Sequence, residues 1–555
     1  MILHRLSIPL SLAVTAVLAV GLAGCRTADQ YMAEADEQVY KAIDNKWDDA
    51  FGSKANYKIS DVEPDPNAIV RDSNVPLPPV LTLAQAVALA TANNRDYQTQ
   101  KEALYISALD LGLERHNFEN QFFGGVLSGY SANDQSGDKV VFNEGNFGFN
   151  RLLTTGARIS THVAVSWAEI LMGDRLSRGV TPILGFSVLQ PLLRGSNRDI
   201  VMENLTQAER NTLYQIRAFN RYRQTFVVSV VTQYYLILQT YDSAENARKN
   251  YQTMLWLYRK TKLLTEAGRL PKFEANRAKS EALKALDTYV QQRKLYEQAL
   301  DDYKLVLGVP ATANFDLDPA EIQQLRTAEL PYPEFTEEEA VETALQRRLD
   351  LVNVADFVID AGRKVKVAED ALRAELNIGA DIAELGREGV DIGSQPRLDR
   401  GGRVMIDTGR PDPINDQIRA VIELDLPLER ESEKNLYRKS LIALSQAKRD
   451  YELATDATTL EVRRAYRDLK EAAERYRIQQ EALASAREQF QRTYAMLQYG
   501  QASSRRLIDA QGDFYAAQDA ATFALVSYNV ATLNFYRDAG VMRVLPDGMW
   551  KVNAK

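Results

Sequence analysis

The sequence predicts a mainly α-helical fold that also contains membrane-type β-strands and is arranged as two repeats of one plan. Three observations predict it. The stretches 196–267 and 431–498 keep a helical pattern far beyond the length of an ordinary globular helix. A region of alternating, strand-like pattern precedes each stretch. The two halves of the chain also align with each other, in one order and at a nearly constant offset.

The chain begins with the pattern of a secretory signal. His4 and Arg5 precede an apolar run over 6–20, which is too short to span a bilayer as a helix of the mature protein. The segment 22–24, with the sequence LAG, then places two small residues directly before Cys25. This arrangement is typical of a bacterial lipoprotein cleavage site, so cleavage is expected directly before the cysteine.

Cys25 is the only cysteine of the chain. We expect residues 1–24 to be removed and Cys25 to be diacylglycerol-modified and acylated, which leaves no thiol for disulfides, zinc sites or catalysis. The alternative, a buried free thiol, fits poorly because such cysteines normally lie inside core elements. Arg26 stands where aspartate would argue for retention in the inner membrane, so resemblance to sorted lipoproteins favours a lipid anchor in the outer membrane.

The composition excludes several functions. A net charge of −8 offers no basic surface for nucleic acid. The histidines, His4, His116 and His162, form no pattern of a metal triad or catalytic dyad, and no phosphate-binding glycine loop occurs. After the signal, no apolar run approaches the ~18 residues of a spanning helix. We therefore expect no enzyme, no metal and no cofactor besides the covalent lipid, and any other membrane crossing must use strands.

The internal repeat defines the domains. The segment 81–87 aligns with 335–341 at an offset of 254, and in each a threonine followed three residues later by Gln85 or Glu339 predicts a capped helix start. Further along the offset is 232, as between Gly268 and Gly500, so the first half holds about 22 extra residues before its long helix. Chance similarity is the weaker explanation. We expect five parts, namely the signal 1–24, a linker segment 25–80, the repeats 81–330 and 331–541, and a tail 542–555.

Within each repeat the order is helix, strands, long helix and return helix. Strand-like alternation covers roughly 122–193 in the first repeat, and 376–385 with 417–427 in the second. The polar segment 386–413 between the latter two resembles the long external loop of an outer-membrane barrel. Along the first long helix the apolar residues step by four and three, which predicts coiled-coil packing; they are Val227, Val231, Tyr234, Leu238 and Tyr241.

These parts constrain one another. Four to six strands per chain are too few to close a barrel, and open strand edges in lipid are prohibitive, so several copies must close one barrel together. The long helices turn at Gly268 and Gly500 and return as coiled-coil hairpins. A ring of such hairpins makes a tube, and at ~1.5 Å per residue each long helix spans roughly 100 Å. The tube would extend into the periplasm.

Over residues 80–541 the chain resembles the TolC family of outer-membrane efflux proteins. Besides the repeat plan and the lipobox, the resemblance rests on the segments 190–195 (QPLLRG), 426–428 (LPL), 499–500 (YG) and 507–510 (LIDA). It implies a homotrimer with a twelve-stranded barrel, four strands per chain, and a periplasmic α-helical tunnel that is closed at its tip. It also implies a passive conduit for efflux or secretion that works with a periplasmic adaptor and an inner-membrane pump, with the hairpin turns meeting the adaptor.

The first repeat departs from this pattern, because an additional hairpin is indicated near 146–167. The strand count is therefore open. Between an eighteen-stranded barrel and long strands with a folded external extension, we expect the extension.

The resemblance also suggests a gate. In the family, acidic residues just after the glycine turns line the periplasmic aperture. Aligned from Gly500, Asp509 falls on such a position and Arg506 on its neighbour; aligned from Gly268, Glu274 falls on the equivalent acid of the first hairpin. Arg506 could pair with Asp509 within or across protomers. The alternative is that these carboxylates belong to solvated helix turns, where charges are common.

Two points concern the remainder of the chain. Residues 31–47 predict a short polar helix, and the prolines between 64 and 79 favour an extended linker that joins the anchor to the first repeat, with a disordered tether as the alternative. The competing function is a lipid-anchored periplasmic coiled-coil adaptor or structural spacer without channel activity. Two full repeats with strands before each long helix argue against it.

Overall fold

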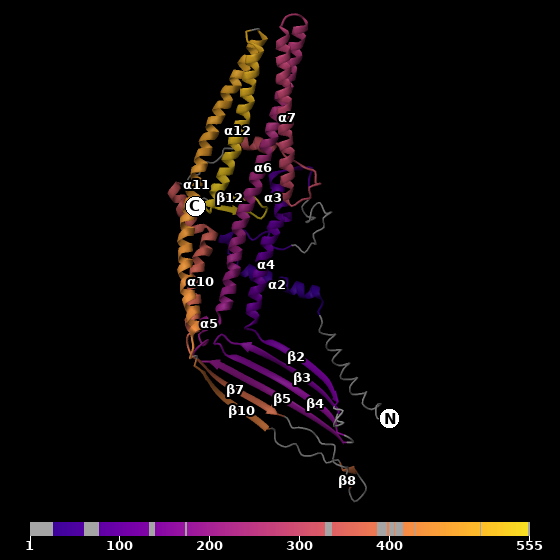
Figure 1. Cartoon of the computed structure of the whole chain (residues 1–555), viewed down its shortest axis with the longest axis vertical. Helices are drawn as coiled ribbons and strands as arrows, with labels where there is room; N and C mark the ends of the chain where they lie inside the picture. The colour runs from indigo at the N-terminus through magenta and orange to yellow at the C-terminus, as the bar shows by residue number, and fades with distance from the viewer. Residues whose placement is uncertain are drawn as a thin grey trace. The chain divides into compact units, whose positions relative to one another are not determined.

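The structure is a computed structural model of the whole chain (Figure 1). It describes residues 26–59, 77–132, 139–172, 175–327, 336–385, 397–398, 404–405, 415–426, 428–499 and 501–552. The chain divides into two compact units, the first comprising Met1–Asn45, Ser107–Thr212 and Phe357–Ala447, and the second Lys46–Ile106, Leu213–Asp356 and Lys448–Lys555. Each unit therefore combines segments from both sequence repeats.

Helices make up most of the described chain. Their bounds are α2 Ala28–Lys46, α3 Leu83–Asn93, α4 Arg95–His116, α5 Arg198–Val201, α6 Glu203–Glu266, α7 Lys272–Leu307, α8 Ala320–Thr327, α9 Glu337–Arg347, α10 Leu349–Asp370, α11 Glu431–Gln498 and α12 Ser504–Asp538, with the short 3-10 helix η1 Asp49–Phe51. With 64 and 68 residues, α6 and α11 are the predicted long helices. At ~1.5 Å per residue each is about 100 Å long.

The first unit contains one large antiparallel sheet, drawn as a row of neighbouring arrows in Figure 1. Its order within the described residues is β10-β7-β5-β4-β3-β2. The strands are β2 Gln121–Ala132, β3 Lys139–Leu152, β4 Arg158–Met172, β5 Arg175–Pro191, β7 Glu375–Leu385 and β10 Asn415–Asp425. The first repeat thus supplies four of these six strands and the second repeat two.

This strand count corrects one expectation. We expected the extra hairpin of the first repeat to be a folded external extension, and the structure instead places it in the sheet. β3 pairs with β4 without interruption from Leu152 opposite Arg158 to Lys139 opposite Leu171, and β2 continues the sheet beyond β3. The reason is that β2 and β3 are as long as their neighbours and pair along their whole length, so backbone pairing continues outward to β2.

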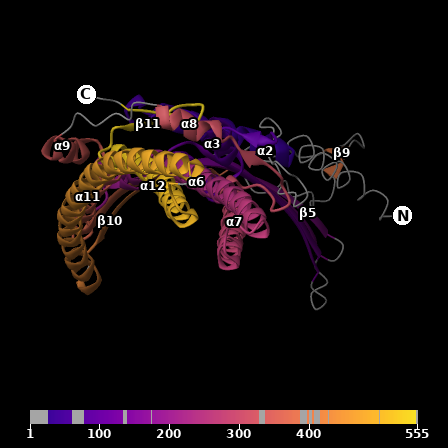
Figure 2. The same ribbon diagram turned by 90° about the horizontal axis from the view of Figure 1, so that it is seen from above.

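The second unit contains two helical hairpins. In the first, α6 packs against α7 through ring contacts such as Tyr234 with Tyr303, whose centroids lie 6.5 Å apart. In the second, α11 packs against α12, and Phe490 stacks on Phe514 at 5.5 Å. Seen from above in Figure 2, α12 lies beside α6, and the hydrogen bond from Asn246 to Asp519, at 2.6 Å, joins them. The predicted coiled-coil hairpins are confirmed.

The ends of the return helices show the repeat in atomic detail. Gly308 after α7 and Gly540 after α12 are 232 residues apart, and both have a left-handed backbone, with φ of 72° and 71°. The next N–H donates to the carbonyl five residues earlier in both repeats, Val309 to Lys304 and Val541 to Tyr536. These are Schellman-type caps, which favour glycine because a side chain is strained at this φ.

The helix starts were also predicted correctly, but the first helix of each repeat is broken. Thr82 with Gln85 and Thr336 with Glu339 form complete capping boxes at α3 and α9. Neither helix runs unbroken past residue 94 or 348. Instead Asn94 and Arg348 are extended, with ψ of 131° and 117°, and new helices start directly after them. In the first repeat, Asn94 accepts a hydrogen bond from the Tyr97 N–H at 2.9 Å, which stabilises the new start.

The ends of the chain are more ordered than expected. The predicted polar helix is α2, which in the first unit packs Ala42 against Leu111 and Ala208. In the second unit the tail forms a hairpin of β11 Met542–Val544 and β12 Trp550–Val552. Ser53 Oγ donates to the Val544 carbonyl at 2.6 Å, so the segment after α2 is fastened to this hairpin. The short strands β1 Val80–Leu81 and β6 Asp316–Leu317 pair in parallel, and β8 Arg397–Leu398 pairs with β9 Val404–Met405.

The two glycine caps provide a matched pair of substitutions. We predict that Gly308→Ala lowers the free energy of unfolding more than Gly540→Ala. In both variants the left-handed backbone destabilises an alanine by roughly 1–2 kcal/mol. At Gly308 the new Cβ would also lie 2.3 Å from the Asn93 backbone oxygen, whereas at Gly540 the nearest atoms are 3.5 Å away. Urea unfolding followed by circular dichroism measures both. Equal losses would show that the close approach at Gly308 is unimportant.

Candidate functional site

The large sheet has one apolar face, which its register defines. Successive paired residues on this face run across all six described strands in a single row, from β2 to β10. The row consists of Phe122, Phe149, Thr161, Phe186, Ile382 and Ile418. Neighbouring rows on the same face add further exposed apolar side chains, namely Val126, Tyr130, Phe147, Val163, Leu184, Ile378 and Ile422. Such a face needs an apolar partner.

The opposite face is largely polar. Its described side chains include Gln121, Asn146, His162, Ser187, Asp381, Arg419 and Glu423. The rings on this face lie over glycines of the neighbouring strand, as His162 over Gly185 and Phe142 over Gly129. Alternation of apolar and polar residues over strands of 11 to 17 residues matches the pattern of a membrane barrel wall, which needs ~9–11 residues per strand to cross the bilayer.

The first hairpin turns where the sequence predicts. Gly268 follows α6 with φ of 71°, and the Arg269 N–H donates to the Leu264 carbonyl at 2.9 Å. Glu274 lies in the first turn of α7, where a carboxylate is favoured by the helix dipole. Close to this turn, Leu263 and Phe273 leave about two thirds of their area exposed.

The second hairpin has an equivalent turn. Gly500 itself lies outside the described residues, but the Gln501 N–H donates to the Met496 carbonyl at 2.9 Å, which is the counterpart of the bond at Arg269. Asp509 and Arg506 are both exposed on α12. The partner of Asp509 within the chain is Arg505, at 3.9 Å, and not Arg506. The Arg506 side chain has no hydrogen bond or ion pair with the rest of the described chain.

The charges at the two turns are exchanged between the repeats. The return helices begin at the equivalent residues Lys272 and Ser504, 232 positions apart. Glu274 therefore corresponds to Arg506, and Arg277 corresponds to Asp509. The structure does not bring Glu274 into contact with the pair on α12. What it establishes is that each hairpin presents an acid and a base one helical turn apart, in opposite order.

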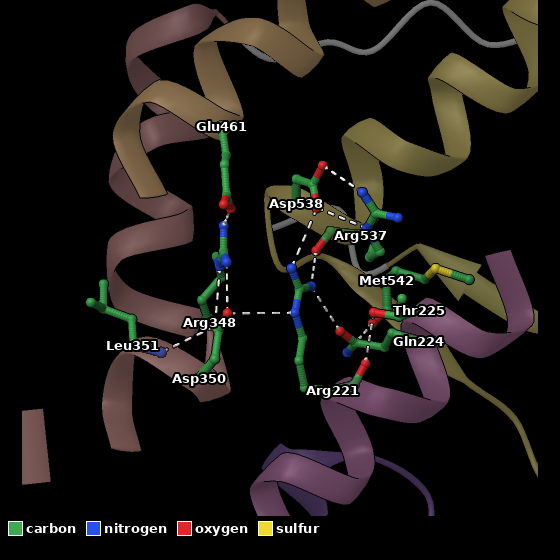
Figure 3. Close-up of polar contacts among 10 residues, drawn as sticks. All are labelled: Arg221, Gln224, Thr225, Arg348, Asp350, Leu351, Glu461, Arg537, Asp538 and Met542. Atoms are coloured by element: carbon green, nitrogen blue, oxygen red, sulfur yellow. Dashed lines mark hydrogen bonds and ion pairs between the residues drawn. The ribbon is translucent and has the colours of Figure 1, made fainter. Parts of the chain in front are cut away.

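A network of ion pairs joins four helices of the second unit, as Figure 3 shows. Arg348, at the break between α9 and α10, donates to Asp350 and to Glu461 of α11, each at 2.6 Å. Arg221 of α6 donates to the Arg537 carbonyl at 2.6 Å and to Asp538 at 3.3 Å, both at the end of α12. A weaker contact of 3.8 Å between Arg221 and Asp350 connects the two halves of the network.

Burial makes this network matter for stability. The Arg348 side chain is only 7 % exposed. Burial opposes its charged form, but the hydrogen bonds that Arg348 donates to Asp350 and Glu461 outweigh this and raise the pKa of Arg348. Burial likewise disfavours the Asp350 carboxylate, and Arg348 and Arg221 together reverse that effect and lower its pKa. Burial lowers the pKa of Arg221, because the nearby charges of Arg348 and Arg537 oppose the attraction of Asp350 and Asp538. Charges held in this way fix the relative positions of the four helices.

Sequence reasoning did not find this network. Its residues come from four helices, and the spacing along the chain connects only Arg348 with Asp350 and Arg537 with Asp538. The repeat offers one usable signal. Arg348 is the repeat equivalent of Asn94, and each of these two residues ends the first helix of its repeat.

Two further searches concern the described residues only. No group of three or more histidine, cysteine, aspartate or glutamate side chains is arranged there to hold a metal ion. Across the same ranges, every helix is too short or too polar to cross a membrane. Cys25, the predicted lipidation site, lies outside the described part of the chain.

Comparison with known proteins identifies the fold and finds a family match for part of the chain. Residues 340–540 match the family model of the outer membrane efflux protein. A search of curated protein sequences found no match. Among solved structures, the CmeC outer membrane channel of Campylobacter jejuni has a TM-score of 0.56 at 15 % identity, covering 89 % of this chain and 91 % of that one.

Two other channels share the fold. The open state of the MtrE outer membrane channel of Neisseria gonorrhoeae has a TM-score of 0.57 at 13 % identity, covering 82 % of this chain and 88 % of that chain. CusC, described for its transmembrane channel formation, has a TM-score of 0.57 at 14 % identity, covering 82 % and 92 %. The match to the outer membrane efflux protein family thus covers the second repeat, and the fold of these outer membrane channels is shared along most of the chain.

Proposed function

We propose that the protein is the outer-membrane channel of a tripartite efflux or secretion system, with three copies forming one passive conduit across the periplasm and the outer membrane. The amphipathic sheet is the observation that supports this most strongly. One face is apolar across all six strands of the sheet, and neither edge strand has a further neighbour among the described residues. A lipid-exposed sheet must close its edges, and further copies of the same chain can do so.

The partners follow from the same proposal. A passive channel needs an energy source, which an inner-membrane pump would supply through a periplasmic adaptor. The hairpin turns at Gly268 and Gly500 are the proposed adaptor contacts. Exposed apolar side chains near both turns support this, because isolated hairpins gain nothing from exposing them; these are Leu263, Phe273, Met496 and Tyr499.

The conduit can be tested directly in a lipid bilayer. The purified full chain should have the mass of a trimer by light scattering in detergent, and it should give discrete single-channel conductance steps in planar bilayers. A water-filled tunnel through the trimer is the physical reason. A monomer without conductance would refute the proposal and favour a lipid-anchored coiled-coil adaptor or spacer.

We infer a gate at the hairpin ends. Three copies would place three Asp509 and three Arg506 side chains, with Glu274 and Arg277 of the other hairpin, around one axis. The opposite order of acid and base in the two repeats supports this, because neighbouring hairpins could then pair unlike charges. Arg506, without a partner in the described chain, is available for such a pair.

Replacing Asp509 by alanine should raise the single-channel conductance and its open time, since one side of each inter-hairpin pair is lost. The matched control is Arg505→Ala, which removes only the exposed intrahelical partner of Asp509 and should leave conductance unchanged. If Asp509→Ala and the wild type have equal conductance, the gate is refuted, and these residues are ordinary solvated charges in helix turns.

Anchoring and domain limits complete the proposal. We propose that a lipid on Cys25 attaches residues 25–80 to the outer membrane, ahead of the repeats 81–330 and 331–541 and the tail 542–555. Cells grown with labelled palmitate should incorporate label into the wild-type chain and none into Cys25→Ser. Equal labelling of both chains would exclude Cys25 as the modified residue.

A further inference from the structure

We propose that three copies of this chain close a barrel of eighteen strands, in which all six described strands of each copy form the membrane wall. This inference rests on the proposed channel function and specifies its membrane part. The partner at each sheet edge is a second copy of the same chain, with β2 of one copy pairing with β10 of the next. Three considerations support it, and they concern the pattern of β2, the continuity of the sheet and its edges.

The first consideration is that β2, the edge strand that the first repeat supplies to the described sheet, has the residue pattern of a membrane-spanning strand. Phe122, Val126 and Tyr130 lie on the apolar face of the sheet and are each more than half exposed. Phe122 and Tyr130 are eight positions apart, which is about 27 Å along a strand. At the usual barrel tilt of roughly 40° this gives about 20 Å of height, close to the ~25 Å apolar band between the two aromatic girdles of a membrane barrel. An extension in water would not need this pattern.

The second consideration is that the apolar face has no break between β3 and β4. If β2 and β3 folded away as an external extension, pairing would stop at β4. Instead Phe149 of β3 lies opposite Thr161 of β4, and Phe147 lies opposite Val163, within fourteen consecutive pairs. Phe122 of β2 also contacts the rings of Phe147 and Phe149, with centroids 6.4 and 5.8 Å away. The four strands of the first repeat therefore form one wall segment.

The third consideration is the geometry of the two edges. Every neighbouring pair in the sheet is antiparallel, so the first and last of the six described strands run in opposite directions. β2 of one copy can thus continue the antiparallel pattern onto β10 of another. Both edges expose large apolar side chains, such as Val126 on β2 and Ile418 and Ile422 on β10. In lipid an unpaired edge leaves backbone groups without hydrogen bonds, which costs several kcal/mol per group.

Three chains with six strands each give eighteen strands. Barrel diameter grows roughly linearly with strand number, so this barrel would be about one and a half times as wide as the twelve-stranded barrel that four strands per chain would close. Barrels of about 16–18 strands leave an aqueous channel. The polar inner face, with Asp381, Arg419 and Glu423, would then border open water.

Disulfide formation between copies distinguishes the two barrels. We would introduce one cysteine on β10, at Ile418 or Ile422, together with one on β2, at Phe122, Val126 or Tyr130, in the full chain. The comparison set pairs the same β10 positions with Ile159→Cys, Val163→Cys or Val165→Cys on β4. In the eighteen-stranded barrel, β4 is three strands from any β10, about 14 Å at ~4.8 Å per strand, which is beyond the reach of a disulfide.

We expect copper-phenanthroline oxidation to shift at least one β2–β10 variant from monomer to dimer and trimer on non-reducing gels. The β4–β10 variants and the wild-type chain should stay monomeric, and reductant should reverse the shift. Ladders from β4–β10 variants alone, in a protein that is trimeric by light scattering, would overturn the eighteen-stranded barrel and leave the channel intact. The eighteen-stranded barrel would also be overturned if the protein is trimeric by light scattering but none of the six β2–β10 variants gives a ladder. A protein that is monomeric by light scattering would overturn the channel itself.

Discussion

The need to pair the edges of one sheet determines most of this structure. The sheet has an apolar face that only lipid or another apolar surface can cover, and each backbone group at its edges must find a hydrogen-bond partner once it is in lipid. A single chain cannot meet that requirement with six described strands. The proposed channel therefore requires several copies, and in that proposal the helical hairpins of each copy belong to a ring because the strands that precede them do.

The helices supply the rigidity that such a ring requires. Each hairpin has ring-on-ring packing along its seam, and each return helix ends in the same glycine cap. The buried network around Arg348 adds a link between four helices at the point where the first helix of the second repeat is broken. The exposed charges near Gly268 and Gly500 have no comparable support. Buried ion pairs away from the hairpin turns and exposed charges close to them suit a conduit that opens at its tip.

Much of the fold could be predicted from sequence because it depends on local signals. Capping boxes at Thr82 and Thr336, glycine caps, alternation in strands and the repeat itself are all readable along the chain. The expectation of an external extension was wrong because β2 and β3 contain glycines that lower strand propensity and interrupt the alternation. Gly129 and Gly148 are needed beneath Phe142 and Phe123 of the neighbouring strand. The ion network depends on three-dimensional placement, which spacing alone does not give. The Arg505–Asp509 pair, by contrast, joins residues four apart on one helix, and its spacing could have indicated it. Cys25 and Gly500 stay predictions.

The orientation of the sheet in the membrane can be measured at two adjacent residues of β4. His162 lies on the polar face and Val163 on the apolar face, so cysteines at these positions should report opposite environments. In proteoliposomes, a charged, water-soluble maleimide should label His162→Cys and leave Val163→Cys unlabelled, while a lipid-soluble maleimide should label Val163→Cys. Equal labelling of both by the charged reagent would place both faces in water, and the sheet would not be the wall of a membrane channel.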